Sequence, residues 1–446
     1  MKKRLFCDIK EVYLIGIGGA FMSAIAKYCV FHGKKVSGSD REKSENTESL
    51  KKIGVKIYVG HSENNFKSAD AVVYSSAISD DNPELLKAKK SGTDIYKRSE
   101  FLGVILNDFK NVIAVAGCHG KTTTTSMLAH VLAESGKAPT AFIGGEDSVF
   151  GNFLAGDKAV AVTEACEYKK NFLDIYPTVS VIMNTDFDHV DSYKDENDLK
   201  QTYKKFSENS FKIINADDKN CAYLSNGKSL TFGFTDKAFY RAENLKKGVN
   251  GYSFTLTVGG VKKFRVRLKV PGRYNVYNAL AAYAASQTLG VSPGIAKKSL
   301  ENFTSVKRRT EFLGEYGNKK LYADYAHHPN EISSVIPVFS EKSLFVFQPH
   351  TYSRTKTLKD EFSDALKNVD CVIYKTYPAR ETYDSQGDAY SLYLSLKSKS
   401  SKNVFYAKNI KNLKRIIDDF DGTTVIFLGA GNLYFFAKKF FIDKKF

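Results

Sequence analysis

Short hydrophobic runs alternate with amphipathic stretches along almost the whole chain. Residues 112–116, 179–183 and 424–428 are apolar, end in polar or glycine-rich segments, and have the length of buried strands. Residues 22–31 and 275–288, by contrast, have the length and residue spacing of helices. Strands that alternate with helices are typical of parallel sheets. The pattern therefore predicts an α/β protein with mainly parallel sheets.

The chain has 446 residues, which is too long for a single core of the usual ~100–200 residues. Residues 229–270 have the pattern of antiparallel strands, and Gly259-Gly260 is a suitable hairpin turn. We predict three domains: a Rossmann-like domain over 1–105, a central P-loop ATPase-like α/β domain with an antiparallel β extension over 106–306, and a Rossmann-like α/β domain over 307–446.

Composition favours a soluble protein in a reducing compartment. No apolar stretch approaches the ~18–20 residues that cross a bilayer. The basic N-terminus resembles an export signal, but Asp8, Lys10 and Glu11 interrupt its apolar part, so we expect a first strand there. The six cysteines form no closely spaced pair, which fits reduced thiols in the cytoplasm.

The net charge of +17 indicates anionic partners. Because the lysines are scattered and not gathered in a stripe or tail, the charge does not favour nucleic acid. We expect small phosphate- and carboxylate-bearing substrates, no nucleic acid, no membrane insertion, and a monomer or weak homo-oligomer.

A phosphate-binding loop lies between the run 112–116 and a helical segment. When a strand, a glycine loop and a helix follow one another, backbone N–H groups and the helix N-terminus converge on an anion. Lys121 can reach the outer phosphates, and the hydroxyl of Thr122 can bind Mg²⁺. The usual pattern requires a glycine at position 115, where Val115 stands, so the loop is a shorter form. It predicts an ATP site built from Gly117, Cys118, His119, Gly120, Lys121, Thr122 and Thr123.

Two further polar clusters follow predicted strands, at the sheet edge where α/β proteins hold ligands. Glu164 follows residues 159–163, and His189 follows residues 179–183. A carboxylate suits Mg²⁺, and a histidine suits a second or softer divalent ion such as Mn²⁺. The sequence predicts a metal site formed by Thr122, Glu164 and His189.

A second anion site is predicted in the first block. Gly18 and Gly19 belong to a glycine loop after the strand at 11–16, and Asp40 follows about 20 positions later, as in dinucleotide-binding folds. Phe21 occupies the place of the third glycine, which disfavours NAD and favours a related nucleotide diphosphate. Ser75 and Ser76 end another strand and offer hydroxyls to such a ligand.

The third block carries basic and titratable groups. Arg308 or Arg309 could contact a transferring phosphoryl group, and Arg354 could pair with a substrate carboxylate. A further cluster that could hold an amine or a second ion consists of Asp324, His327 and His328. Two nucleotide sites plus amine- and carboxylate-binding groups indicate ATP-driven condensation, in which a phosphorylated carboxylate is attacked by an amine.

These motifs together resemble the Mur ligases of peptidoglycan synthesis. The resemblance runs in the same order along nearly the whole chain, at residues 16–19 with Met22-Ser23, 38–40, 117–125, 164–168, 188–189, 275–280, 308–309, 324–329 and 347–355. It implies cytoplasmic ligation, with a UDP-substrate domain, an ATPase domain and an amino-acid domain. It adds Ser23 to the UDP site, Asn275 and Asn278 to the ATP site, and His328 with Arg354 to the amino-acid site.

Within that family, the segment 347–354 favours the branch that joins L-alanine to UDP-N-acetylmuramate over the branch that joins a ready-made tripeptide to the same sugar nucleotide. The sequence departs from the common pattern at Cys118, usually Thr, at Thr351, often Arg, and at Phe21. Rival classes are a basic nucleic-acid-binding P-loop protein and a nicotinamide oxidoreductase. The scattered lysines disfavour the first, and Phe21 with the second nucleotide loop disfavours the second.

Overall fold

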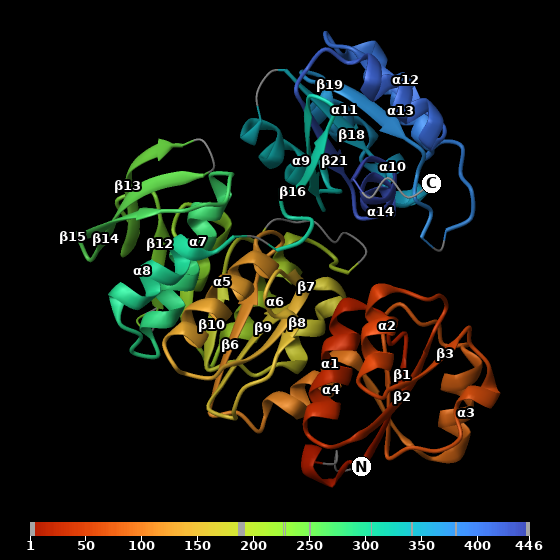
Figure 1. Cartoon of the computed structure of the whole chain (residues 1–446). Helices are drawn as coiled ribbons and strands as arrows, with labels where there is room; N and C mark the ends of the chain where they lie inside the picture. Colours follow the sequence, from red (N-terminus) through yellow and green to blue (C-terminus); the bar gives the residue numbers. More distant parts are fainter. Residues whose placement is uncertain are drawn as a thin grey trace. The chain divides into compact units, whose positions relative to one another are not determined.

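The computed structural model describes residues 5–185, 192–225, 227, 229–248, 251–304, 306–339, 342–379 and 381–442. The chain forms two compact units. The first contains the described residues up to Lys269 together with Asn275–Thr304, and the second contains Val270–Tyr274 and the described residues from Val306 onward. Three sheets with helices between their strands confirm the α/β prediction (Figure 1).

The first sheet has five strands in the order β3-β2-β1-β4-β5, and every neighbouring pair is parallel. The order reverses at β1, and ligands of doubly wound sheets bind where the order reverses. The predicted glycine loop follows β1 directly. The elements are β1 (Glu11–Ile15), α1 (Ala20–Phe31), β2 (Lys35–Asp40), α2 (Glu45–Lys52), β3 (Lys56–Val59), β4 (Ala71–Tyr74), α3 (Pro83–Ser91), β5 (Asp94–Lys97) and α4 (Arg98–Leu106).

The second sheet has ten strands in the order β15-β14-β13-β12-β11-β10-β6-β9-β7-β8, with β6 near its middle. Its elements are β6 (Asn111–Ala116), α5 (Lys121–Glu134), β7 (Thr140–Asp147), β8 (Gly151–Leu154), β9 (Val160–Ala165), β10 (Val179–Ile182), α6 (Glu196–Ser207), β11 (Phe211–Asn215), β12 (Ser229–Gly233), β13 (Tyr240–Lys247), β14 (Tyr252–Val258), β15 (Val261–Arg267), α7 (Tyr274–Gln287) and α8 (Pro293–Asn302).

The antiparallel extension is confirmed for β13, β14 and β15, which pair antiparallel in chain order. Gly259 and Gly260 join β14 to β15 with φ of 55° and 80°, as a tight hairpin turn requires. The prediction is wrong for β12, which pairs parallel with both β11 and β13. This strand continues the parallel α/β part of the sheet, because helical segments separate β10, β11 and β12.

The third sheet has six strands in the order β16-β17-β21-β18-β19-β20. Only the edge strand β16 is antiparallel to its neighbour. The elements are β16 (Glu311–Tyr316), β17 (Lys319–Asp324), α9 (Pro329–Val335), β18 (Ser343–Phe347), α10 (Tyr352–Thr357), α11 (Lys359–Leu366), β19 (Asp370–Tyr374), α12 (Ala389–Lys399), β20 (Val404–Ala407), α13 (Ile410–Asp419), β21 (Thr424–Leu428) and α14 (Leu433–Ala437).

A shared core explains why the first two sheets belong to one compact unit. Helix α1 packs against β7 and β8 of the second sheet. The ring of Tyr28 on α1 lies 5.5 Å from Phe142 and 6.1 Å from Phe153, measured between ring centroids. These side chains belong to one buried apolar cluster that also contains Val12 of β1. The domain boundaries at 105 and 306 therefore stay predictions.

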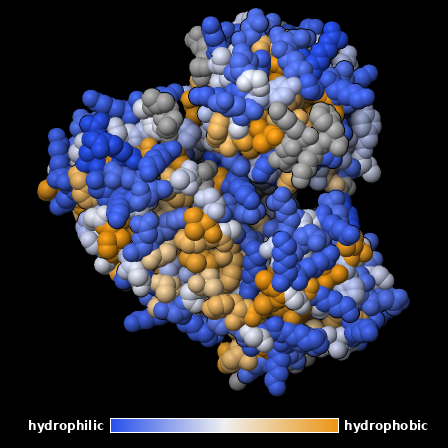
Figure 2. Space-filling model, in the orientation of Figure 1, coloured by the Kyte–Doolittle hydropathy of each residue, from blue (hydrophilic) through white to orange (hydrophobic). Residues whose placement is uncertain are grey.

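The outer surface is largely hydrophilic in the view of Figure 2, with hydrophobic residues interspersed. Among the described residues, no helix is both long enough and apolar enough to cross a bilayer. All six cysteines are free thiols in the structure.

Candidate active site

The phosphate loop joins the end of β6 to the start of α5. Gly117 and Gly120 have φ of 132° and 87°, a region that residues with a side chain rarely adopt. A Cβ on Gly117 would approach the carbonyl oxygen of Asn184 to 2.9 Å, and one on Gly120 would approach Oδ1 of Asn278 to 2.5 Å. Both glycines are thus required by conformation and by space.

Asn184, which lies just after β10, holds the middle of this loop. Its Oδ1 accepts a hydrogen bond from the backbone N–H of His119 at 3.0 Å, and its Nδ2 donates to the carbonyl of His119 at 3.0 Å. The side-chain amide therefore pairs with the loop as a neighbouring strand would. Asn184 was not assigned to the site from the sequence, although an amide at the end of a strand beside the loop was the available signal.

Lys121 begins α5 and is held inside the loop. Its Nζ donates to the carbonyls of Gly117 and Cys118 and lies 3.1 Å from both carboxylate oxygens of Glu167. Burial lowers the pKa of Lys121, but the electrostatic effects of Glu167, Cys166 and Cys118 are larger together. The pKa of Lys121 is therefore raised. Tyr193 donates to the backbone carbonyl of Glu167 at 2.6 Å and helps to fix this carboxylate.

Thr122 and Glu164 bring two oxygen donors together. The Thr122 hydroxyl donates to Glu164 Oε2 at 3.1 Å, and the backbone N–H of Gly144 donates to Oε1. The sequence had suggested that Glu164 follows the strand. In the structure it lies within the strand, as the fifth residue of β9. Two hard oxygen ligands fit Mg²⁺. His189 lies outside the described residues, and among those described no three acidic, His or Cys side chains cluster as a metal site.

Asn275 and Asn278 lie on α7 against the start of α5. Asn278 Nδ2 donates to Asn275 Oδ1 at 2.8 Å, and the Thr124 hydroxyl donates to Asn278 Oδ1 at 3.2 Å. Both asparagines are buried. The structure therefore brings these two predicted residues to the phosphate loop, while their contact with a nucleotide stays a prediction.

Several residues of the predicted UDP site lie together at the ends of β1 and β2. The backbone N–H of Gly18 donates to Asp40 Oδ2 at 2.8 Å, and Asn46 Nδ2 donates to the Gly18 carbonyl at 2.8 Å. Ser75 and Ser76 follow β4 on the neighbouring side of β1, where Ser75 is half-buried and Ser76 exposed. These residues and Gly19 lie at the strand ends where the sheet order reverses.

Ser23 has a different environment. It is fully buried, donates to the Ala20 carbonyl at 2.9 Å and accepts from Asn152 Nδ2 at 2.7 Å. Asn152 belongs to β8, so this contact links α1 to the second sheet. A role for Ser23 in binding UDP stays a prediction.

In the second unit, Arg308 lies just before β16, and its side chain reaches the loop that follows β21. Its Nη2 donates to the carbonyls of Gly429 and Gly431 at 2.6 and 3.1 Å, and its guanidinium lies 4.7 Å from the ring of Tyr325. Two carbonyls of the glycine-rich loop 429–432 therefore bind an arginine. Arg309 lies over the same Tyr325 ring at 5.1 Å.

Asp324 ends β17 and accepts three hydrogen bonds. Thr310 donates to Oδ2 from its backbone and hydroxyl at 2.7 and 3.0 Å, and Ala326 N–H donates to Oδ1 at 2.8 Å. Burial raises the pKa of Asp324, against the opposing charge of Arg309. The carboxylate thus shapes the turn that carries the arginines. His328 is the N-cap of α9, where its backbone N–H donates to Glu331.

His327, His350 and Arg354 lie close together at the ends of β17 and β18. The imidazole centroids of His327 and His350 are 5.7 Å apart, and His350 stacks on Tyr377 at 5.5 Å. Burial, with the charges of His327 and Arg354, lowers the pKa of His350 to about 4. Arg354 is half-buried and makes no ion pair with a carboxylate in the described part of the chain. His350 was not assigned from the sequence, although it lies in the quoted segment 347–355.

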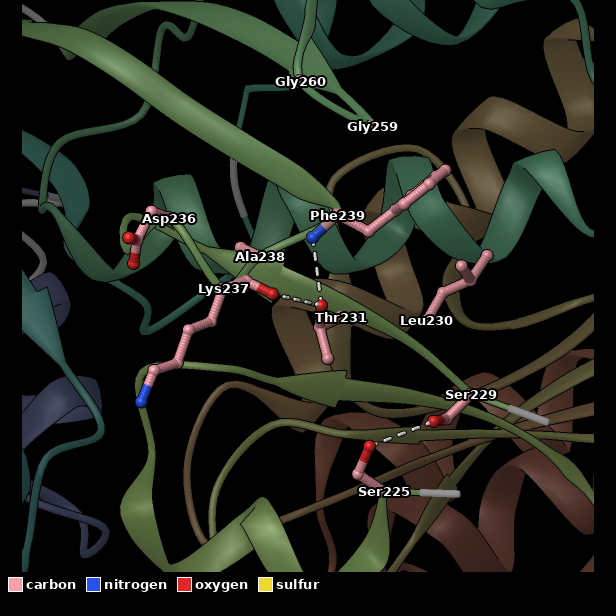
Figure 3. Close-up of a pocket in the computed structure, with 10 residues that line it drawn as sticks. All are labelled: Ser225, Ser229, Leu230, Thr231, Asp236, Lys237, Ala238, Phe239, Gly259 and Gly260. Atoms are coloured by element: carbon pink, nitrogen blue, oxygen red, sulfur yellow. Dashed lines mark hydrogen bonds between the residues drawn. The ribbon is translucent and has the colours of Figure 1, made fainter. Parts of the chain in front are cut away.

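A hollow of about 510 Å³ lies at the extension, between β12 and the β14–β15 hairpin (Figure 3). The Thr231 hydroxyl donates to the Lys237 carbonyl and accepts from the N–H of Phe239, each at 3.0 Å. None of the predicted site residues lines it. The predicted site residues therefore lie away from this hollow.

Comparison with known sequences gives matches over most of the chain. Residues 11–110 match the Mur ligase family catalytic domain, and residues 115–286 match the Mur ligase middle domain. The chain is 40% identical to the UDP-N-acetylmuramate–L-alanine ligase of Acetivibrio thermocellus, over 98% of this chain and 96% of that protein. It is 39% identical to the ligase of the same name from Clostridium acetobutylicum, over 97% of both chains.

Solved structures agree with these matches. The crystal structure of the UDP-N-acetylmuramate–alanine ligase of Thermotoga maritima superposes with a TM-score of 0.85 and 31% identity, covering 98% of this chain and 99% of that one. A ligase from Neisseria meningitides that acts on UDP-N-acetylmuramate and a tripeptide gives a TM-score of 0.60 and 28% identity over 67% of this chain and 100% of its own. With identity of 39–40% over nearly the full length, the chain belongs to the Mur ligase family.

Proposed function

We infer that the protein joins the amine of L-alanine to the lactyl carboxylate of UDP-N-acetylmuramate, with conversion of ATP to ADP and phosphate. The observation that carries this inference is the full-length similarity to alanine ligases, which is higher in sequence identity and in TM-score than the similarity to the tripeptide ligase. The reaction would be a cytoplasmic step of peptidoglycan synthesis.

The phosphate loop supports the first half of the reaction. A carboxylate is a poor electrophile, and its phosphorylation by ATP gives an acyl phosphate that an amine can attack. Lys121 would exchange Glu167 for the γ-phosphate, where its positive charge stabilises charge that develops during transfer. The buried Asn275 and Asn278 would position the nucleotide from α7.

Thr122 and Glu164 would hold Mg²⁺, because their oxygens already meet at the end of β9. His189 is proposed for a second divalent ion, Mg²⁺ or Mn²⁺. When bound, such an ion neutralises the charge of the phosphate oxygens.

The second unit would supply the amino acid. Arg354 would pair with the alanine carboxylate as a bidentate donor. His327 and His350 would lie beside the amine, with His350 kept neutral by burial. Since Arg308 is bound to two loop carbonyls, we propose Arg309 as the group that contacts the transferring phosphate.

The test is release of phosphate from ATP with Mg²⁺ and UDP-N-acetylmuramate, compared for L-alanine, glycine, L-serine and the tripeptide. We expect fastest turnover with L-alanine and a product whose mass equals both substrates minus water. Turnover with the tripeptide alone would instead identify the recycling reaction. Sedimentation of the same preparation would test the monomer or weak homo-oligomer that we propose.

A further inference from the structure

Arg98, the first residue of α4, places a guanidinium against the ring of Phe21. The guanidinium carbon lies 4.9 Å from the ring centroid, within the range of a cation–π contact. Phe21 is the second residue of α1 and replaces the third glycine of the dinucleotide-binding pattern. Phe21, which disfavours a nicotinamide site, therefore stabilises the positive charge of Arg98 through its aromatic ring.

Helix α4 is fixed next to the segment that follows Glu164. The Ser99 hydroxyl donates to Asn171 Oδ1 at 3.3 Å, and Asn171 lies in the 3₁₀ segment η3 (Tyr168–Asp174). A Cβ on Gly103 would come within 2.1 Å of the Asp174 carbonyl oxygen, so only glycine allows this approach. These contacts hold the first turn of α4 near the carboxyl end of β9.

Acidic groups lie around Arg98, and one of them, Glu164, is bound to other groups. Burial lowers the pKa of Arg98, while Cys166, Glu164 and Asp174 act in the opposite direction, which places the guanidinium near the end of β9. Glu164 already accepts from Thr122 and from the Gly144 N–H. Glu167, two positions after Ala165, is paired with Lys121. Within the described ranges, Arg98 has no ion pair and no hydrogen bond from its side chain.

A half-buried guanidinium without a carboxylate partner is suited to an anionic ligand. Its planar fork matches a carboxylate with two parallel hydrogen bonds. Its ring partner Phe21 follows the glycine loop after β1, and the charge of Glu164 acts on the guanidinium, so Arg98 lies near residues of both predicted nucleotide sites. A carboxylate that is to be phosphorylated must lie between these two sites, where the charge of Glu164 would otherwise repel it.

We propose that Arg98, supported by the ring of Phe21, binds the lactyl carboxylate of the sugar nucleotide and so selects the acid-bearing sugar. This inference rests on the proposed function. Arg98 keeps the acid ionised and holds one oxygen toward the phosphate loop. It is a specificity-determining residue that contacts the substrate and not the metal or ATP.

The experiment compares two ligands that differ in this carboxylate. UDP-N-acetylmuramate carries the lactyl group, and UDP-N-acetylglucosamine has the same nucleotide and sugar ring without it. Binding of each is measured by calorimetry without ATP, for the wild type and for R98A, R98K and F21L. The matched control is K97A, which removes an exposed charge from the residue directly before α4. Thermal unfolding of each variant reports whether it is folded.

We expect R98A to weaken binding of UDP-N-acetylmuramate about ten- to a hundredfold, the range of a charged hydrogen-bonded contact, and to leave UDP-N-acetylglucosamine within about twofold. R98K and F21L should give smaller losses with the same selectivity, and K97A should give none. Equal losses for both ligands, or no loss for either, would overturn the assignment. If the wild type binds neither ligand, the proposed function itself fails.

Discussion

Lys121 and Glu167 form a buried ion pair inside the phosphate loop, with Nζ 3.1 Å from each carboxylate oxygen. The same nitrogen donates to two loop carbonyls, so the donor capacity of the ammonium group is used. A phosphate that binds Lys121 must therefore replace protein partners. Glu167 would hold the lysine in place before nucleotide binds, and it would oppose nucleotide binding until it is displaced.

Glu167→Gln tests this exchange. We expect the unliganded protein to lose about 1–3 kcal/mol of unfolding free energy, because a buried ammonium loses its carboxylate. ATP should bind more tightly than in the wild type, since no ion pair must be broken. Urea unfolding and ATP titration measure the two effects, and the exposed Glu134→Gln on α5 is the control. Weaker ATP binding by E167Q would contradict the exchange.

Lys121→Ala should abolish most activity with the fold retained. Loss of one charge partner of the transition state typically lowers kcat by about 10²–10³. Steady-state rates at saturating substrates, measured well below the unfolding temperature, give the effect. Lys121→Arg keeps the charge and should retain more of the activity. Turnover near that of the wild type in K121A would refute the assignment of the loop.

Much of the fold follows from local pattern. The run at 424–428 is a strand with the predicted bounds, and the Gly259-Gly260 turn is where two adjacent glycines allow positive φ. The direction of a strand depends on its partners in the sheet and less on its own sequence, which is why β12 was predicted wrongly. Its orientation is set by pairing with β11 and β13 and not by its own alternation of side chains.

The sequence placed Lys121 and Thr122 correctly in the glycine loop after a strand, and Glu164 meets Thr122 from within β9 and not from beyond its end. Asn184 and Glu167 were not assigned, because their role depends on contacts across the loop and not on their own motif. Arg98 gave no signal in the sequence. Its position depends on Gly103 and on a ring 77 residues earlier, at Phe21, which only the folded chain brings beside it.

Thiol reagents should inactivate the protein through Cys118. This thiol is partly exposed within the phosphate loop, whereas burial raises the pKa of Cys166 and makes it a poorer nucleophile. In a C7S background, which removes the exposed thiol, we expect ATP with Mg²⁺ to slow inactivation at least about tenfold by occupying the loop. C118T should resist the reagent. Inactivation that saturating ATP leaves unchanged would reject this prediction.

Arg354→Ala should raise the KM for L-alanine by about ten- to a hundredfold, as expected for loss of a charged contact, with little change in the KM for ATP. Arg354→Lys should recover part of the loss, because it keeps the charge without the planar fork. Initial rates over a range of alanine concentrations measure this. A variant with unchanged KM for alanine and raised KM for ATP would move Arg354 to the nucleotide.

His350 should make the second unit less stable in acid. Its pKa is lowered by burial to about 4 in the folded protein, against about 6.5 when unfolded, so the unfolded chain binds more protons between these values. Stability from the neutral imidazole is complete above pH 6.5 and is lost as the pH falls toward 4, by up to about 3 kcal/mol. His350→Gln removes the titrating group and keeps a polar side chain. The unfolding free energy of H350Q should fall less steeply from pH 6.5 to 4 than that of the wild type, and parallel curves would show that the imidazole does not titrate as the structure requires.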